Sequence, residues 1–165
     1  MKADLPNNEQ ARLDALREYG ILDTPPEQAY DDIAYLASLI ADTPIAVVSL
    51  VDDDRQWFKA KVGIEASQTS RDIAFCSHAI LEPGQLFIVP DATEDERFAT
   101  NPLVTTDPKI RFYAGAPLVA PGGEALGALC VIGPRRKAAL GPAGPCRLTC
   151  ESRSKRSCAS FPPTA

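Results

Sequence analysis

Residues 45–63 constrain the fold most, because two consecutive segments there have the pattern of paired β-strands. The first, IAVVSLV at 45–51, is apolar on both faces and rich in β-branched residues, which predicts a central strand covered on both sides. The second, RQWFKAKVG at 55–63, alternates and predicts two distinct faces, Phe58, Ala60 and Val62 on one and Trp57, Lys59 and Lys61 on the other. Three aspartates separate the segments, so we expect an antiparallel hairpin.

Two amphipathic helices are predicted ahead of this hairpin. Residues 8–19 place Leu13, Leu16 and Tyr19 on one helical stripe, which ends before a glycine. The second helix is expected to begin at the capping box Thr24-Pro25-Pro26-Glu27 and to end at Asp42-Thr43-Pro44. Its apolar stripe, which we expect to lie on the core, consists of Ala29, Ile33, Leu36 and Ile40.

The remaining segments up to residue 133 predict a second hairpin and several irregular stretches. Residues 85–90 have the pattern of a short strand, and residues 91–104 that of a loop with one helical turn. The segments 111–120 and 124–133 flank Pro-Gly-Gly and predict two further antiparallel strands.

The charges are divided unevenly along the chain. Residues 1–133 contain 10 Lys and Arg against 21 Asp and Glu, whereas residues 134–165 contain seven basic residues and one acid. An acidic body repels phosphate backbones, so we expect no nucleic-acid partner. The N-terminus lacks a secretory pattern and no apolar run approaches the ~18 residues of a membrane span, so a cytoplasmic protein without a membrane partner is expected.

The tail, residues 134–165, differs from the body in composition. It is basic, rich in proline and cysteine, and without helical or strand periodicity, which indicates disorder or a shifted reading frame. Three of the five cysteines lie there, and only Cys76 and Cys130 lie in the body. An odd number without signs of export argues against a disulfide framework.

Six segments together resemble the GAF domain family in order and spacing. They are LREYGILDTPPEQAYDDI, PIAVVSLVDDDRQWFKAKVG, RDIAFCSHAI, VPDATEDERFATNPLV, IRFYAGAPL and ALGALCVI. The likeness is to modules that open bacterial sensor histidine kinases and diguanylate cyclases. It divides the chain into an N-terminal helical extension (1–24), a GAF domain (25–133) and the tail (134–165).

The resemblance implies an α+β fold, a GAF-like antiparallel sheet of five or six strands with helices packed on one face and a loop-covered pocket on the other. It also implies a non-catalytic sensory module in two-component or cyclic-di-GMP signalling, which binds a small-molecule ligand, forms a homodimer, or does both. The helix at 8–19 is one candidate dimer element. Two alternatives stay open, a scaffold used for dimerisation only and a thiol-dependent reductase of the methionine sulfoxide type.

Cys76 and His78 are the first candidate site, because His78 is the only histidine in the chain. A catalytic dyad would need the imidazole within hydrogen-bond reach of the thiol, and no third orienting group can be placed. Two residues do not make a metal site, and Ser77 between them departs from the pattern of bilin attachment. We therefore expect no catalytic residue, no cofactor and no metal, with Cys76 packed as a small hydrophobe and His78 at a pocket edge.

Trp57, Asp91, Arg111 and Tyr113 complete the predicted ligand contacts. Arg111 and Tyr113 share one face of their strand, and Asp91 opens the loop opposite, so the three could orient a small polar ligand. The alternative is an Arg111–Asp91 pair that only fixes the loop. The Trp57 ring could stack on a ligand or pack against a neighbouring helix or loop. The family's cyclic-nucleotide motif, Asn-Lys-x-Phe-Asp-Glu, does not occur, which disfavours a cyclic nucleotide.

Overall fold

The computed structural model describes residues 2–137, which form one six-stranded antiparallel sheet of order β3-β2-β1-β6-β5-β4. The strands are β1 (Ile45–Val51), β2 (Arg55–Val62), β3 (Gln68–Ser70), β4 (Phe87–Val89), β5 (Phe112–Val119) and β6 (Ala125–Gly133). Both predicted hairpins are present as β1–β2 and β5–β6. The predicted α+β fold is confirmed, with six strands.

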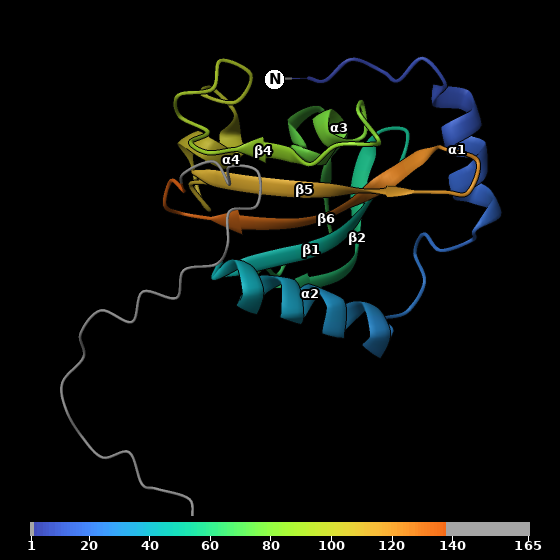
Figure 1. Ribbon diagram of the computed structural model, residues 1–165, viewed down its shortest axis with the longest axis horizontal. Coiled ribbons are helices and arrows are strands. Elements are labelled where there is room, and N and C mark those ends of the chain that lie inside the picture. Colours follow the sequence, from blue (N-terminus) through green and yellow to red (C-terminus); the bar gives the residue numbers. More distant parts are fainter. Residues whose placement is uncertain (1, 138–165) are drawn as a thin grey trace, which may run out of the picture.

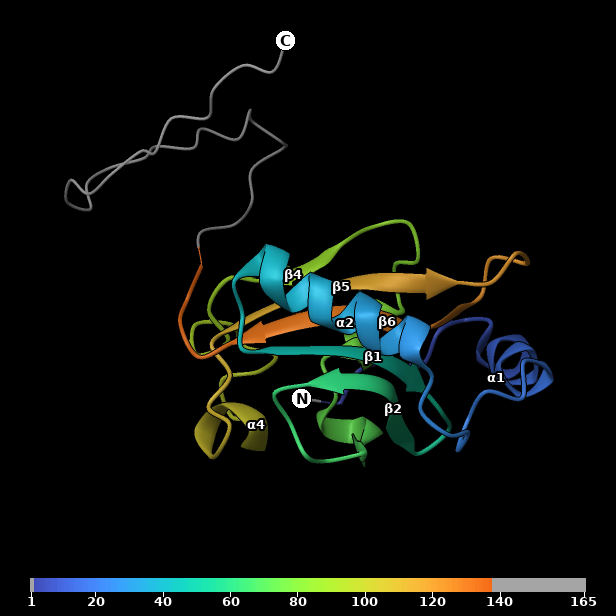
Figure 2. The same ribbon diagram turned by 90° about the horizontal axis from the view of Figure 1, so that it is seen from below.

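Helices and loops cover the two faces of the sheet differently. The helical elements are α1 (Glu9–Glu18), α2 (Gln28–Ala41), the 3₁₀ turn η1 (Arg71–Ile73), α3 (Cys76–Ala79) and α4 (Pro102–Thr105). In Figures 1 and 2, α2 crosses one face and α1 lies beside the β5–β6 turn. The short helices α3 and α4 and long irregular segments lie on the opposite face. The sheet therefore has a helical side and a loop side.

The core follows the same division. On the helical side, α2 places Ala34 against Val48 and Ala60, and α1 places Leu16 against the cluster that contains Trp57. The larger cluster on the loop side joins sheet residues to α3, α4 and the segment between them. The larger apolar core of the protein therefore lies on the loop side of the sheet.

A β-bulge in β2 contradicts the predicted faces of this strand. Val48 pairs with Ala60 but the next residue, Ser49, pairs with Phe58, so Lys59 is one extra residue in β2. Phe58 consequently packs on the loop side, whereas Ala60 and Val62 pack near α2. The prediction that these three share a face was wrong, because the extra residue reverses the alternation.

Lys59 is buried because its ammonium group has three partners in the segment between α1 and α2. Its Nζ donates to Thr24 Oγ1 at 2.7 Å and to the Pro25 carbonyl at 2.9 Å, and it forms an ion pair with Glu27 at 2.5 Å. Thr24 therefore does not cap α2, which begins at Gln28 rather than at the predicted capping box. The bulge directs the Lys59 side chain at this segment between α1 and α2, called the linker below, instead of at solvent.

The outer face of α2 also corrects a prediction. The residues expected on the core, Ile33, Leu36 and Ile40, are 46%, 53% and 85% exposed, and Ala29 is exposed too. The helix instead rests on Ala34, which is fully buried. A small side chain lets the helix backbone approach the sheet closely, and this contact turns the large apolar side chains outward.

The chain beyond β6 is described for four residues only. Lys137 donates to the carbonyls of Ala41 and Asp42 at the end of α2, with the Asp42 contact at 2.9 Å. The predicted disorder or frameshift of the tail concerns residues 134–165, of which 138–165 lie outside the described residues. Within residues 2–137 no helix is long and apolar enough to span a bilayer.

Candidate functional site

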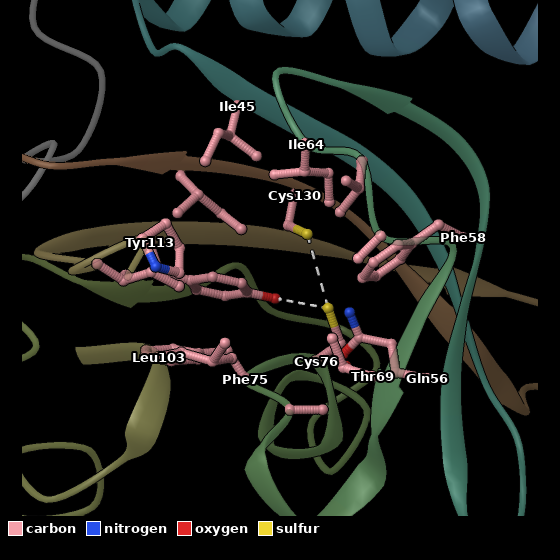
Figure 3. Close-up of a pocket in the computed structure, with 16 residues that line it drawn as sticks. Ile45, Gln56, Phe58, Ile64, Thr69, Phe75, Cys76, Leu103, Tyr113 and Cys130 are labelled. Atoms are coloured by element: carbon pink, nitrogen blue, oxygen red, sulfur yellow. Dashed lines mark hydrogen bonds between the residues drawn. The ribbon is translucent and has the colours of Figure 1, made fainter. Parts of the chain in front are cut away.

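A cavity of about 120 Å³ lies between the sheet and the segments of the loop side. Its wall is mainly apolar, with side chains from all the strands except β4, from α3 and α4, and from the adjoining loops. The apolar lining includes Ile45, Val47, Phe58, Ile64, Phe75 and Leu103. Figure 3 shows these side chains around a few polar groups, which come from Gln56, Thr69, Cys76, Tyr113 and Cys130.

Three polar groups surround the Cys76 sulfur. Its Sγ lies 3.0 Å from the Ser49 hydroxyl, 3.1 Å from the Tyr113 hydroxyl and 3.6 Å from the Cys130 sulfur. All four side chains are buried. Figure 3 shows the Tyr113 hydroxyl and the Cys130 sulfur pointing at Cys76 from two sides. Cys76 is therefore the centre of a hydrogen-bonded cluster.

The sheet register explains why these groups meet. Cys130 pairs with Val47 on one side and with Gly115 on the other, which brings β5 and β6 together beneath α3. The Tyr113 ring then crosses Gly115, and its hydroxyl oxygen lies only 2.4 Å from where a Cβ at Gly115 would stand. Glycine at this position therefore allows the phenol to reach Cys76.

Hydrogen bonding makes the two thiols unequal. The hydrogen bond from Cys130 lowers the pKa of Cys76 against the opposing effect of burial, and the bonds from Ser49 and Tyr113 lower it further. The same bond to Cys76, together with burial, raises the pKa of Cys130. Burial, followed by the nearby sulfurs, raises the pKa of Tyr113. Cys76 is thus the more acidic member of the pair.

Two polar atoms in the cavity wall have no hydrogen-bond partner among residues 2–137. They are Gln56 Oε1 and Thr69 Oγ1, both buried. The two residues are direct neighbours across the β2–β3 pairing, so their side chains arise from one place in the wall. Unsatisfied buried polar atoms are rare, and each needs a physical explanation.

The structure places Cys76 and Tyr113, both predicted contacts, together on the cavity, but it separates His78 from them. Cys76 and His78 are two apart on α3, and side chains at this helical spacing point about 200° apart. The His78 ring packs against Phe98 and Phe87 at centroid distances of 4.8 and 6.1 Å and lines a different hollow. The geometry therefore provides no Cys76–His78 dyad.

The other three predicted contacts also lie away from the cavity. Trp57 packs in the cluster with Leu16 on the helical side. Asp91 accepts from the amide and hydroxyl of Thr93, and hydrogen bonds from this hydroxyl and amide lower the pKa of Asp91. Arg111 donates to the carbonyls of Val104, Lys109 and Ile110. The ion pairs found within residues 2–137 do not include one between Arg111 and Asp91.

Sequence reasoning missed Gln56, Thr69, Ser49 and Cys130. Gln56 is two residues before Phe58 on β2, so the two side chains point to the same face of the sheet. This spacing was the only indication in the sequence of a polar side chain on the loop side. Cys130 is two residues after Ala128 on β6, and this spacing was the available signal that both side chains lie on the loop side. A search of residues 2–137 finds no group of three or more His, Cys, Asp or Glu side chains arranged for a metal ion.

Comparison with known proteins gives a consistent picture. A model of the GAF domain family matches residues 25–143. A cyclic di-GMP phosphodiesterase of Pseudomonas aeruginosa is 44% identical over 127 residues, which is 77% of this chain and 22% of that protein. The chain thus spans about a fifth of this curated relative.

Solved structures share the fold at low identity. The free methionine-R-sulfoxide reductase of Neisseria meningitidis aligns with a TM-score of 0.53 at 15% identity, covering 82% of this chain and 81% of that one. The GAF domain of a phosphoenolpyruvate-protein phosphotransferase from Coxiella burnetii aligns with a TM-score of 0.52 at 16% identity, covering 81% and 84%. At this identity the likeness establishes the fold alone.

Proposed function

The chain belongs to the GAF domain family, and we propose that it is a non-catalytic sensory module that binds a small molecule in the cavity beside Cys76 and Tyr113. The observation that carries the proposal is that two polar atoms in a mainly apolar wall, Gln56 Oε1 and Thr69 Oγ1, have no hydrogen-bond partner among residues 2–137. A buried acceptor without a donor costs about 1–3 kcal/mol, and a bound ligand can supply the donor.

The size of the cavity supports a ligand of about one ring. At about 120 Å³ it is slightly smaller than the ~150 Å³ cavity that admits benzene in an engineered protein. A cyclic nucleotide is much larger than this space. We therefore infer a compact, mainly apolar ligand with at least one O–H or N–H group, directed at Gln56 and Thr69.

The relative from Pseudomonas aeruginosa suggests the output of the signalling system. It is a cyclic di-GMP phosphodiesterase, and the matching region is about a fifth of it. We infer that the present module regulates cyclic di-GMP turnover as part of a larger signalling system. We also infer a cytoplasmic setting, because a reducing compartment keeps thiols such as Cys76 and Cys130 unpaired.

Phenol and toluene test the ligand proposal, because they are nearly equal in size and only phenol has a hydroxyl donor. Titration calorimetry and thermal unfolding should show saturable binding of both, with phenol binding more tightly. Native mass spectrometry of gently purified protein would reveal a resident ligand. Absence of saturable binding by either probe would contradict a ligand-binding cavity.

The exposed face of α2 favours a second function, self-association with another copy of the chain. Ile33, Leu36 and Ile40 are joined there by exposed Tyr35 and Leu39, so five large apolar side chains project from one helix of 14 residues. Such a patch usually marks an interface. A two-fold dimer would bring the same helix of both copies together. In contrast, α1 uses Leu13 and Leu16 for packing within its own chain.

Light scattering after size exclusion tests this second function. We expect the chain to be dimeric and Ile40→Lys to shift it toward monomer, because the substitution places a charge in the apolar contact. Gln28→Lys, an exposed substitution on the same helix, is the matched control. A monomeric parent chain at all concentrations would exclude the proposal.

A further inference from the structure

Cys76 and Cys130 have a spatial relation that ligand binding does not require. The residues are 54 positions apart in the sequence, one on α3 and one on β6, yet their sulfurs lie 3.6 Å apart. Both sulfurs face the cavity, so a molecule that enters it reaches them. A thiol pair that served only for packing would not need the hydroxyls of Ser49 and Tyr113 at 3.0 and 3.1 Å from one of its sulfurs.

We propose that Cys76 and Cys130 are a redox modification site, at which a small peroxide converts the two thiols to an intramolecular disulfide. The proposal goes beyond the sensory function above and does not depend on ligand binding. The module would then respond to oxidants as well as to a small molecule. Disulfides in the cytosol are usually transient, and they serve catalysis or redox sensing.

The roles of the two cysteines follow from their hydrogen bonds. Cys76 accepts from Cys130, Tyr113 and Ser49 when it is a thiolate, so it is the nucleophile. Ser49 Oγ also lies 3.0 Å from the Ala128 carbonyl, and its single proton can move from that carbonyl to the sulfur as charge develops. Cys130 keeps its proton until it attacks, and so acts as the resolving thiol.

The reaction balances in two steps. The Cys76 thiolate attacks one oxygen of hydrogen peroxide, an S–O bond forms, the O–O bond breaks, and hydroxide leaves and takes up a proton to become water. The Cys130 sulfur then attacks the Cys76 sulfenic sulfur, the S–S bond forms, and hydroxide leaves with the Cys130 proton. Overall, two thiols lose two electrons and two protons, and one peroxide becomes two waters.

Forming the disulfide requires a modest local movement. An S–S bond is ~2.05 Å long, so the sulfurs must approach by about 1.5 Å. The Cys76 side is the one expected to move, because α3 has only four residues whereas β6 is paired on both sides. The movement changes the position of Cys76 in the cavity wall.

The test uses the full chain with the three tail cysteines replaced by serine (Cys146→Ser, Cys150→Ser, Cys158→Ser). Native protein is treated with hydrogen peroxide, denatured, alkylated, and analysed by peptide mass spectrometry. We expect both remaining thiols to disappear together and a linked Cys76–Cys130 peptide to form, reversibly with dithiothreitol. Two thiols that are still fully alkylated after the peroxide treatment, or Cys76 oxidised without a link to Cys130, would overturn the proposal.

Variants of the same protein test the assigned roles. Cys130→Ser should leave Cys76 as a sulfenic acid that dimedone traps, and Cys76→Ser should leave Cys130 unreactive. Tyr113→Phe should slow oxidation about tenfold near neutral pH and move the pH–rate profile to higher pH, because one hydrogen bond to the thiolate is lost. Tyr19→Phe, at an exposed tyrosine outside the cavity and outside the apolar face of α2, is the control. An unshifted profile in Tyr113→Phe would refute the role of the phenol.

Discussion

Replacing Gln56 by methionine tests whether the orphan amide is a binding determinant. Methionine has nearly the same length and shape, but no carbonyl oxygen that needs a donor. Gln56 Oε1 is buried without a hydrogen-bond partner among residues 2–137, a situation that costs about 1–3 kcal/mol. We therefore expect Gln56→Met to raise the free energy of unfolding by about this amount.

The expected effect is measurable by two independent methods. For a domain of this size each kcal/mol shifts Tm by roughly 2–4 °C, so calorimetry should show a rise of about 2–12 °C. The phenol donor recovers the same energy in the parent chain, which gives it roughly a 5–150-fold preference over toluene. In Gln56→Met this preference should shrink toward unity.

The control is Gln85→Met, the same substitution at an exposed position, which should change stability by at most about 0.5 kcal/mol. The reasoning is refuted if Gln56→Met destabilises the protein while the ratio of phenol to toluene affinity stays as in the parent. That outcome would mean that the Gln56 amide already has its donor and that ligand preference comes from elsewhere in the wall.

Three further predictions concern residues that do not line the cavity, Glu9, Lys59 and Trp57. Burial raises the pKa of Glu9, but hydrogen bonds from Arg12 and Arg71 outweigh this effect and lower the pKa from 4.5 to about 2. The ionised Glu9 carboxylate therefore stabilises the fold above pH 4.5, and this contribution is lost as the pH falls toward 2. Urea unfolding from pH 6 to pH 2.5 should show a smaller acid-dependent loss in Glu9→Gln than in the parent or in Glu18→Gln. Lys59→Met should cost about 1–3 kcal/mol in the same assay, because three contacts to the linker are lost, whereas Lys61→Met, with an exposed side chain, should cost less than about 1 kcal/mol. Trp57→Phe should leave the phenol affinity within about twofold of the parent, since Trp57 lies on the helical side; a larger change would place it in the ligand path.

The hairpin at 45–63 could be predicted because its signals are local. Seven mainly apolar residues, three aspartates and an alternating segment specify two paired strands without reference to the rest of the chain. The bulge at Lys59 could not be predicted in this way. An extra residue in one strand depends on what its side chain meets, and the partners of Lys59 lie 32 or more positions earlier.

The orientation of α2 was equally beyond local reasoning. The helix is apolar on more than one side, so the stripe of Ile33, Leu36 and Ile40 and the stripe around Ala34 both qualify as a core face. Hydrophobicity favours the stripe of Ile33, Leu36 and Ile40 as the core face. Close approach of the helix to the sheet requires the stripe around the small side chain of Ala34. The contact with Val48 and Ala60 decides between them, and it is a property of the sheet rather than of the helix.

The candidate site was only partly accessible for a similar reason. Cys76 and Tyr113 could be proposed from the sequence, because they lie in segments that resemble the family. The roles of Cys130 and Gln56 depend on the strand register, which the sequence does not specify locally. Gly115 on β5, which pairs with Cys130 on β6, illustrates this, because its missing side chain lets the Tyr113 phenol reach the thiols. The sequence shows that position 115 is glycine, but it does not show that the Tyr113 ring lies across it.

Strand β2 connects the proposed site to the helical side of the sheet. Gln56 presents its amide to the cavity, and three residues later the bulge directs Lys59 to the linker between α1 and α2. A ligand that binds one arrangement of β2 more tightly than another must shift the balance between these arrangements. We expect the linker contacts of Lys59 to differ between such arrangements, which would couple the segment between α1 and α2 to the cavity. The stability cost of Lys59→Met measures how firmly this connection is held.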